Sequence, residues 1–257
     1  MIQYDRRRSK MKIIFLGTSH GNPEANRFCS SAAVEVNGKY YVIDAGAPIL
    51  TLLLSRNVHP KDIGGIFITH AHDDHYFGLI EYTRVVNLSG DYHGVSTPVL
   101  VPRKRLFSEM LNTKYNFKLW HGKGRTKYKK YRKGVIFDDG TVKITAIPVK
   151  HILLSYAFLV EAEGKRVLFS GDLKKDMPDY PQILYSEHTD LLVLEAAHTF
   201  INTDNVIEKI NRSKTDRLII NHINPFRNTP EELNSAFSKI NENISCSAAF
   251  DGMEIEL

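Results

Sequence analysis

Three histidines and two aspartates lie within six consecutive positions of the chain, residues 70–75, which read HAHDDH. Imidazole and carboxylate groups are the ligands that zinc and neighbouring divalent metals prefer. The run follows an apolar stretch typical of a buried strand, and a tight loop at that point directs His70 and His72 to one side. A helix that starts at Asp74 and His75 directs these two side chains elsewhere. The spacing therefore predicts one loop that serves two adjacent metals.

Short strands alternate with helices along almost the whole chain, and these elements must position the loop. Runs of β-branched and apolar residues bounded by turn residues predict the strands, and apolar residues at helical spacing predict the helices. Strands and helices interleaved in both halves indicate sheets whose outer faces are covered by helices. We predict an α/β fold in a single domain that spans residues 1–257. The predicted strands are 12–16, 32–36, 40–43, 65–69, 99–101, 142–147, 157–161, 166–169, 191–194, 218–220, 247–250 and 253–257, and the predicted helices are 47–56, 76–88, 103–111, 206–210 and 231–240.

Charge is distributed unevenly along the chain. The whole sequence carries a net charge of +5, yet residues 102–134 contain twelve Lys/Arg and one acidic residue, Glu109. This basic segment is predicted to be an insertion in an otherwise acidic body, and it points to an anionic partner. Aromatic residues interleave with its charges, so lysines could neutralise phosphates while rings stack on bases. A solvated hairpin or loop whose aromatics pack on the body is the alternative. The candidate substrate-binding residues are Lys127, Lys129, Lys130, Arg132 and Lys133.

The HAHDDH run resembles the HxHxDH motif of the metallo-β-lactamase superfamily. Residues 15–46, which begin FLGTSHGNPEANRFCSS, are similar to the opening of the ribonuclease Z branch, with its LGT…G…P turn and its Arg…Ser-Ser pair. The similarity is continuous over about residues 12–85, and scattered motifs follow it. It implies a four-layer αββα metallo-β-lactamase sandwich with two divalent metal ions at one edge. The expected metal is zinc, with manganese or iron as alternatives.

The resemblance also implies the remaining metal ligands. His151 matches the family's isolated histidine, Asp172 its bridging carboxylate and His222 its closing histidine, and the three follow predicted strands in the expected order. Asp44 matches a carboxylate behind the site that would orient a ligand. The first metal would be held by His70, His72, His151 and Asp172, and the second by Asp74, His75, Asp172 and His222.

The chemistry expected of such a site is hydrolysis. Two metals about 3.5–4 Å apart can share a bridging water and lower its pKa towards neutrality. The resulting hydroxide attacks phosphorus or a carbonyl carbon, and Asp74 is expected to orient it as well as to bind metal. Phosphodiesters, lactones and thioesters all suit this chemistry, so the surroundings of the metals must select the substrate.

Three features favour a phosphodiester substrate. The ribonuclease Z-like opening and the basic segment are the first two. The third is residues 191–200, LLVLEAAHTF, where Glu195 and His198 resemble that branch's Glu-Ala-Thr stretch with its neighbouring histidine. His198 is therefore a candidate to protonate the leaving oxygen, with a purely structural histidine as the alternative.

Two departures from the branch argue against a true tRNA 3′-processing enzyme. The branch usually carries an RNA-clamping arm after the position of His151, but only 20 residues separate His151 from Asp172 here. Its His-Ser-Thr stretch before the last strand is also missing. We therefore favour a phosphodiesterase that acts on a cyclic or small phosphodiester, as in related phosphonate-catabolism phosphodiesterases. The alternatives are an RNA or DNA nuclease, a lactone, thioester or carboxylic ester hydrolase, and a non-catalytic nucleic-acid-binding protein.

Composition bounds the setting in which the protein works. The chain has two cysteines, which excludes a disulfide framework and fits a reducing compartment. Its apolar runs fall short of the roughly 18 residues of a membrane span, and the apolar stretch near its start is too short for a signal peptide. We expect a cytoplasmic protein without membrane contact, either a monomer or a homodimer.

Overall fold

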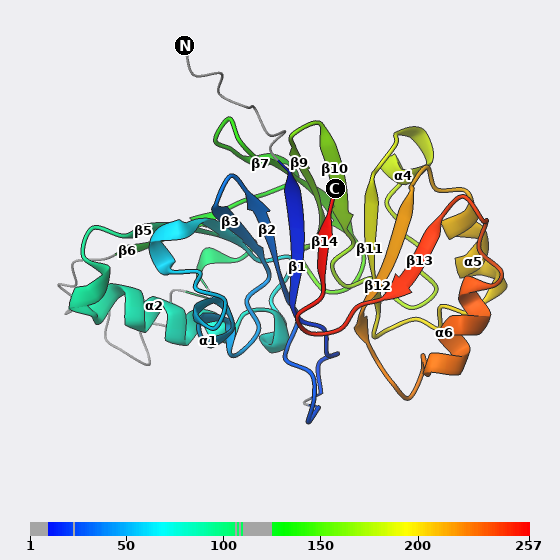
Figure 1. Cartoon of the computed structure of the whole chain (residues 1–257), viewed down its shortest axis with the longest axis horizontal. Coiled ribbons are helices and arrows are strands. Elements are labelled where there is room, and N and C mark those ends of the chain that lie inside the picture. The colour runs from blue at the N-terminus through cyan, green and yellow to red at the C-terminus, as the bar shows by residue number, and fades with distance from the viewer. Residues whose placement is uncertain (1–9, 23, 106, 108, 110–124) are drawn as a thin grey trace, which may run out of the picture.

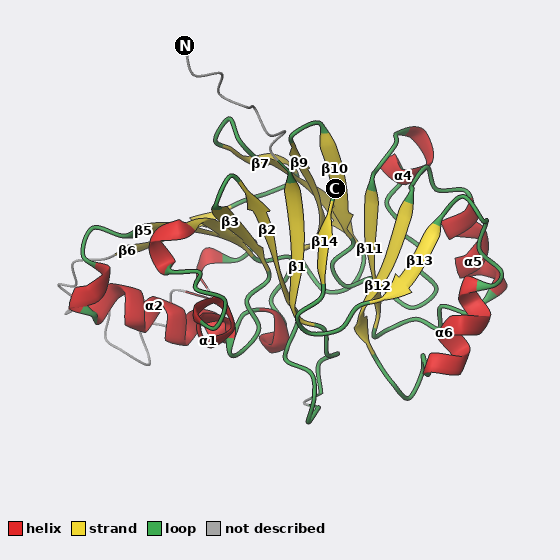
Figure 2. Cartoon of the chain, in the orientation of Figure 1, coloured by secondary structure: helices red, strands yellow, loops and turns green. Residues whose placement is uncertain are grey.

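The computed structural model of the chain describes residues 10–22, 24–105, 107, 109 and 125–257. Within them two seven-stranded sheets face each other, and short helices lie on their outer sides (Figure 1). Figure 2 shows the same layers coloured by secondary structure. The four-layer α/β sandwich predicted from the sequence is confirmed. No helix in the described residues is long and apolar enough to cross a membrane.

The first sheet has the strand order β14-β1-β2-β3-β4-β5-β6. Its strands β3 to β6 are parallel, whereas β14, β1 and β2 pair antiparallel. Because parallel strands end at the same edge, the residues that follow β3, β4, β5 and β6 gather there, where α/β folds place their sites. The strands are β1 (Met11–Gly17), β2 (Ser31–Val36), β3 (Lys39–Ile43), β4 (Ile63–Phe67), β5 (Ser96–Val101), β6 (Arg125–Lys130) and β14 (Glu254–Glu256).

The second sheet has the order β13-β12-β11-β10-β9-β8-β7. Strands β10 to β13 are parallel and the others antiparallel. The pairing of β11 with β12 skips one residue of β12, His222, whose φ of 52° marks it as the extra residue of a bulge. The strands are β7 (Gly134–Asp138), β8 (Lys143–Val149), β9 (Ser155–Ala162), β10 (Lys165–Phe169), β11 (Leu191–Ala196), β12 (Arg217–Ile223) and β13 (Ser245–Ala248).

Helices cover the outer face of each sheet. Apolar side chains of α1 (Ile49–Leu54) and α2 (Gly78–Leu88) form one buried cluster with the first sheet. Those of α4 (Ile183–Ser186), α5 (Asp204–Asn211) and α6 (Pro230–Phe237) form another with the second sheet. The last helix begins at Pro230, one residue before the predicted start, because the Thr229 hydroxyl accepts a hydrogen bond from the Glu232 N–H and proline follows the cap.

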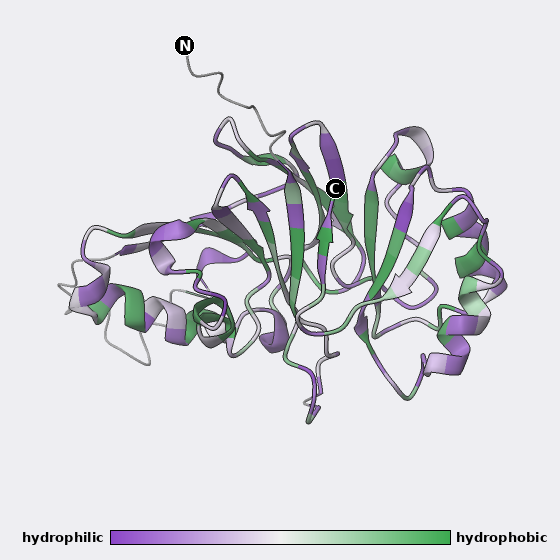
Figure 3. Cartoon of the chain, in the orientation of Figure 1, coloured by the Kyte–Doolittle hydropathy of each residue, from purple (hydrophilic) through white to green (hydrophobic). Residues whose placement is uncertain are grey.

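The core between the sheets is apolar, and Figure 3 colours many residues of the strands as hydrophobic. Phe15 and Phe67 of the first sheet and Phe158 and Val167 of the second are buried in it. Close-packed interiors of this kind hold the sheets in a fixed relation. The edge of the first sheet at which β3 to β6 end is therefore held against the neighbouring edge of the second sheet.

Several predicted elements differ from the observed ones. The helix predicted over 76–88 begins at Gly78 and follows a short 3₁₀ turn, η2 (Asp73–His75). The strand predicted over 247–250 is β13, two residues earlier, because its register with β12 decides its position. Strands β6 and β7 were not predicted, since strongly charged side chains alternate along β6. Part of the helix predicted over 103–111 lies outside the described residues, as do residues 112–124 of the basic segment.

Candidate metal centre

The HAHDDH loop starts where the buried strand β4 ends. The backbone leaves β4 after Phe67, so His70 and His72 are held in the connection, and η2 then turns the chain before α2 begins. Hydrogen bonds from the Ala45 N–H to the His75 carbonyl (2.7 Å) and from the Gly78 N–H to the Ala45 carbonyl (2.9 Å) tie this turn to the segment after β3. The end of the loop is thus fixed to the segment after β3 by backbone contacts.

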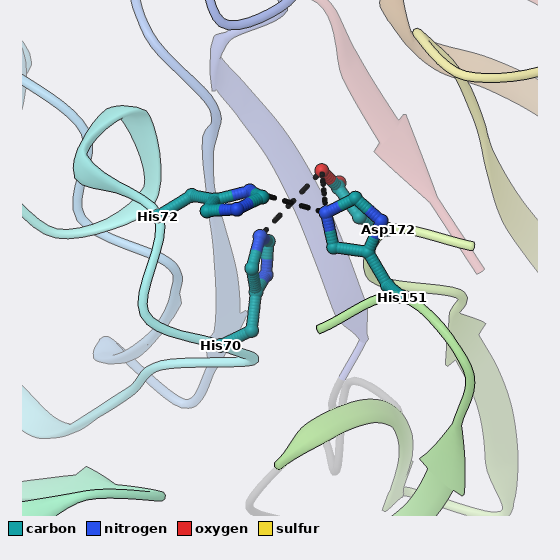
Figure 4. A group of neighbouring side chains, drawn as sticks. All are labelled: His70, His72, His151 and Asp172. Atoms are coloured by element: carbon teal, nitrogen blue, oxygen red, sulfur yellow. Dashed lines mark hydrogen bonds and ion pairs between the residues drawn. The ribbon is translucent and has the colours of Figure 1, made fainter. Parts of the chain in front are cut away.

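Four predicted ligands converge on one space at this edge. The ligand atoms of His70, His72, His151 and Asp172 all lie within 4.8 Å of one another. Figure 4 shows the three imidazoles and the carboxylate pointing towards one another from three different segments. Asp172 Oδ2 lies 3.6 Å from His70 Nε2 and 3.6 Å from His151 Nε2, and His72 Nδ1 lies 3.1 Å from His151 Nε2.

The other three predicted ligands form a second group beside the first. Ligand atoms of Asp74, His75 and His222 also lie within 4.8 Å of one another. Asp172 joins the two groups, because its Oδ1 lies 3.4 Å from His75 Nε2 and its Oδ2 lies 3.5 Å from His222 Nε2. The structure therefore brings all seven predicted ligands together, with Asp172 between the two groups.

Hydrogen bonds behind the imidazoles fix which nitrogen faces the site. Asp44 Oδ2 accepts a bond from His75 Nδ1 (2.7 Å), and the carbonyl of Ser19 accepts one from His222 Nδ1 (2.7 Å). The hydroxyl of Thr69 donates to Asp44 and lies 3.1 Å from His70 Nδ1, which therefore acts as the donor of that bond. In each ring the remaining nitrogen, Nε2, is left facing the site with a lone pair.

The described residues fit divalent metal ions. The Nε2 atoms of His70, His75 and His222 are buried and have no hydrogen-bond partner in the described part of the chain. Buried polar atoms in native proteins are nearly always satisfied, so three such atoms facing one space indicate a missing partner. Imidazole nitrogens and carboxylate oxygens are the donor set that zinc and its neighbours take.

Burial and charge act against each other in this cluster. Burial alone would raise the pKa of Asp172, but the imidazoles of His222, His75 and His70 outweigh it and hold the pKa well below its usual value. Burial lowers the pKa of His70 well below its usual value, with His75 adding to the effect. The carboxylate of the cluster is thus kept ionised and His70 is kept neutral, which are the forms that bind metal.

His198 lies at the mouth of this cluster, on the loop after β11. Its side chain is 34% exposed, and its Nδ1 lies 3.4 Å from Glu195 Oε2 and 3.7 Å from Asp172 Oδ2. Glu195 is buried and also accepts hydrogen bonds from the backbone N–H groups of Ala197 and His198. The backbone of His198 is therefore held by the Glu195 carboxylate, and its ring lies beside that carboxylate with part of it open to solvent.

The basic segment splits into differently placed parts. Lys127, Lys129 and Lys130 lie on the edge strand β6, and Arg132 and Lys133 lie in its connection to β7; all five side chains are exposed. In the same stretch Tyr128 and Tyr131 pack inwards. The Tyr128 hydroxyl lies 2.7 Å from that of Thr83, and the Tyr131 hydroxyl donates to the carbonyl of Ile68 (2.6 Å). The described part of the segment is thus an integral strand, with its aromatics packed on the body and its charges outside.

Four residues that the sequence analysis did not single out support the site. They are Thr69 and Ser19 behind the histidines, Tyr131 beneath the metal loop, and Asn228, whose buried amide donates to the carbonyls of Ala196 and Thr199 and so clamps the loop of His198. In the sequence, one signal could have indicated Thr69 and Ser19, because both lie directly beside motif residues. No sequence signal indicated Tyr131 or Asn228, because their contacts join segments far apart in the chain.

Comparison with known proteins identifies a matching family and several similar sequences. A family model described as Anti-Pycsar protein Apyc1 matches residues 11–206, about three quarters of the chain. Proteins named Ribonuclease Z are similar to it, among them those of Anoxybacillus flavithermus (30% identical over 185 residues) and Prochlorococcus marinus strain MIT 9312 (28% over 182 residues). Each alignment covers 69% of this chain and 58% of the relative. The chain therefore spans 58% of the length of these relatives.

Solved structures share its fold. YhfI of Bacillus subtilis, a metallo-β-lactamase fold protein, aligns with a TM-score of 0.77 at 17% identity, covering 96% of this chain and 100% of that one. The short form of human tRNase Z gives 0.70 at 19% identity, covering 95% and 98%. A diphosphatase of the PhnP family gives 0.69 at 19% identity, covering 96% and 98%. At these identities the likeness is one of fold.

Proposed function

The chain belongs to the family of the anti-Pycsar protein Apyc1, among the ribonuclease Z-like hydrolases of the metallo-β-lactamase fold, and from this premise we propose that it is a binuclear metal-dependent phosphodiesterase. The observation that carries the proposal is the pair of ligand groups that meet at Asp172. Two divalent ions held there, zinc first and manganese or iron as alternatives, would activate water and offset negative charge on phosphate oxygens.

Two residues of the chain have proposed roles in the reaction besides metal binding. Asp74 is proposed to orient the attacking water, and the position of its Oδ2, 3.3 Å from His75 Nε2 and 3.5 Å from His222 Nε2, supports this role. His198 stands at the partly exposed mouth, where a leaving oxygen would depart. We assign it to protonate that oxygen, because its ring is oriented by Glu195 and reaches the edge of the site.

The charge around the site supports a phosphodiester over a neutral ester. The exposed lysines lie on β6. This strand runs parallel to β5 and is two strands away from β4, which leads into the metal loop. A lactone or thioester gains little from such charge, whereas an anionic phosphodiester is attracted by it. We therefore propose a cyclic or small phosphodiester as the preferred substrate.

A substrate panel tests this ranking. Metal-loaded protein is assayed against bis-p-nitrophenyl phosphate, cyclic nucleotides, a tRNA precursor and a set of lactones and thioesters, and light scattering on the same preparation tells a monomer from a homodimer. The expected kcat/KM is highest for a phosphodiester, and the rate should rise with pH through roughly 7. A kcat/KM on lactones or thioesters equal to that on phosphodiesters would reverse the proposal.

The binuclear site is tested by metal content. Wild-type protein expressed with ample metal should carry close to two equivalents, whereas Asp172→Ala should lose both metals because Asp172 lies between the groups. Asp176→Asn is the matched control, since Asp176 is exposed and its φ of 63° suits asparagine. A folded wild-type protein without bound metal in elemental analysis would contradict the proposed site.

A nuclease is the second candidate, favoured by the likeness to proteins named Ribonuclease Z and by the exposed lysines. If RNA binds along β6, its affinity should fall as salt rises. For each phosphate neutralised, the logarithm of the binding constant should fall by about 0.7 to 0.9 for every tenfold rise in salt concentration. Replacing Lys127, Lys129, Lys130, Arg132 and Lys133 by alanine should then flatten this dependence. An unchanged salt slope in that variant leaves the small-phosphodiester proposal in place and removes the nuclease.

A further inference from the structure

A hollow of about 540 Å³ lies on the surface between the ends of β5 and β6 and the loop after β8. Four of its five described lining residues are basic. The fifth is Leu154, which is three positions after the metal ligand candidate His151. We call this feature the basic hollow; its lining residues are Arg103, Lys104, Arg105, Lys130 and Leu154.

The topology of the first sheet sets the place of the basic hollow. Arg103 follows β5, and Lys130 ends β6, while His70 follows β4. The three strands are parallel, so these residues emerge at the same edge. Tyr131, next to Lys130, donates its hydroxyl hydrogen bond to the Ile68 carbonyl and so fixes the end of β6 against the chain that leads into the metal loop.

The separation between the basic hollow and the metal loop follows from strand spacing. Neighbouring strands lie about 4.8 Å apart, so the ends of β5 and β6 stand roughly 5–10 Å to the side of the chain that carries His70. Leu154, which also lines the basic hollow, is joined to His151 by only two residues. A group bound in the basic hollow would thus be about one nucleotide unit away from a phosphodiester held at the metals.

The charge of the basic hollow is largely uncompensated. Arg105 pairs with Glu109 (2.7 Å), but Arg103, Lys104 and Lys130 form no ion pair with any residue that the structure describes. All three side chains are exposed. Like charges held around one concave surface repel each other and focus a positive potential on it. A bound anion would relieve that repulsion.

We propose that the basic hollow binds a second phosphate of the substrate, one nucleotide away from the phosphodiester that is cleaved. The inference rests on the proposed phosphodiesterase function and names its substrate class: a nucleotide-containing phosphodiester with an additional phosphate. Guanidinium and ammonium groups bind phosphate through charge-assisted hydrogen bonds, and Arg103 offers the planar fork that suits two oxygens. The site differs from the five lysines and arginines proposed from the sequence, because only Lys130 is common to both.

A matched pair of substrates tests the proposal. Thymidine 5′-(p-nitrophenyl phosphate) and the same ester with a 3′-phosphate share one scissile bond and differ by one phosphate. The ratio of their kcat/KM values, with phosphate over without, should be about five or more at low salt, which is the effect of two exposed ion pairs. It should shrink as ionic strength rises, because exposed charges are screened.

Variants locate the effect in the basic hollow. In Arg103→Ala/Lys130→Ala the ratio should fall to near one. Lys39→Ala/Lys61→Ala removes the same charge from exposed residues at the opposite end of β3 and β4, and it should keep the wild-type ratio. A ratio near one in the wild-type protein, or an equal loss in both double variants, would overturn the proposal.

A binding measurement separates failure of this inference from failure of the proposed function. Thymidine 3′,5′-bisphosphate should bind the metal-loaded protein about fivefold more tightly than thymidine 5′-monophosphate, and only the hollow variant should lose the difference. No hydrolysis of either ester, with this binding difference present, would remove the phosphodiesterase and leave the phosphate site. Hydrolysis of both esters without the difference would remove the phosphate site alone.

Discussion

The hydroxyl of Thr69 links two parts of the candidate metal centre that the sequence motif treats as separate. It donates to Asp44 (2.9 Å to Oδ2) and accepts from His70 Nδ1 (3.1 Å), while Asp44 also holds His75. One carboxylate therefore orients a histidine of each ligand group, directly in one case and through a threonine in the other. Partners of this kind set ring orientation and ligand basicity.

Thr69→Val should weaken metal binding while the fold persists. Valine keeps the shape of the side chain but removes the bridge, so His70 loses its partner and Asp44 loses one donor. Loss of such a contact typically costs about 10–100-fold in metal affinity. Competition with a chromophoric chelator measures the change in affinity.

Thr97→Val is the matched control for that experiment. Thr97 is also buried, and its hydroxyl lies 2.9 Å from that of Tyr82, away from the ligands. Both variants should lose stability, but only Thr69→Val should lose metal affinity. Equal affinities in the two variants would show that the Thr69 bridge has no influence on the metals.

Cys246 is predicted to be a slow thiol. Burial raises its pKa to about 11 from the ordinary value of 9.0. A raised pKa leaves less thiolate, so at pH 8 its reaction with a disulfide reagent should be roughly a hundredfold slower than in the unfolded chain. The rate should climb about tenfold per pH unit below pH 11. Mass spectrometry of the labelled peptide follows this residue alone, and a native rate equal to the unfolded rate would refute the prediction.

At this scale the sequence predicted which side chains gather at the candidate site, but it missed most of the residues behind them. The seven candidate ligands are named by one compact motif and three ordered matches, and the structure brings them together. Asp44 was predicted to lie behind the site because it also matches a residue of the family. Thr69 is a common residue type, and its role comes from the fold of the loop around Asp44. The bulge that turns His222 towards the site is a pairing property, which a single strand sequence does not encode.

Strand β6 shows where element prediction failed. Its sequence alternates basic side chains with Thr126 and Tyr128, and high charge suggested a loop or a hairpin. As an edge strand it needs one inward face, and Tyr128 supplies it against Thr83 of α2. Lysines on the outward face suit an edge, because they discourage pairing with another chain. The buried strands, with their apolar runs, were predicted to within a few residues.

Tyr131→Phe should uncouple β6 from the metal loop. Tyr131 is buried, and its hydroxyl is the donor to the Ile68 carbonyl (2.6 Å). Phenylalanine leaves that carbonyl without this donor, which costs about 1–3 kcal/mol in the free energy of unfolding. Denaturant titration measures the loss.

Tyr40→Phe provides the comparison for Tyr131→Phe. Tyr40 is half-buried on β3, and no described residue forms a hydrogen bond with its hydroxyl. Its substitution should leave the free energy of unfolding within about 0.5 kcal/mol of wild type. Equal losses in the two variants would mean that the Tyr131 hydrogen bond contributes nothing.

Across the whole molecule, the candidate ligands come from both sheets. His70, His72, Asp74 and His75 follow the first sheet, whereas His151, Asp172 and His222 belong to the second. Ions bound between them would join the sheets at their shared edge. Metal binding should therefore stabilise the packing of the two halves as well as the loop itself.

Chelation should lower the thermal stability of the whole protein. A ligand present at a hundred times its Kd stabilises by about 2.7 kcal/mol. For a chain of this size about 2–4 °C of Tm corresponds to each kcal/mol, so removal with EDTA should lower Tm by roughly 5–10 °C. Differential scanning calorimetry with and without restored zinc checks the value. A Tm that is unchanged both by EDTA and by restored zinc would contradict metal binding between the sheets.

The architecture was predictable because the alternation of strands and helices is strong and the motif is specific. The order of strands in each sheet was not, since it depends on long-range pairing such as that of β14 with β1. The basic hollow could not be predicted from the sequence for the same reason. The parallel ends of β5 and β6 bring Arg103–Arg105 close to Lys130, although more than twenty positions separate them along the chain.

The division of the ligands between the two sheets has a consequence for biosynthesis. The HAHDDH loop is complete at residue 75, but the last candidate ligand, His222, is 147 residues later. At about 5–20 residues per second, a ribosome needs roughly 7–30 s to cover that distance. During this interval the nascent loop offers only half of a chelate. If the seven residues hold two metals as proposed, full occupancy would be a late event that requires both halves of the molecule to have docked.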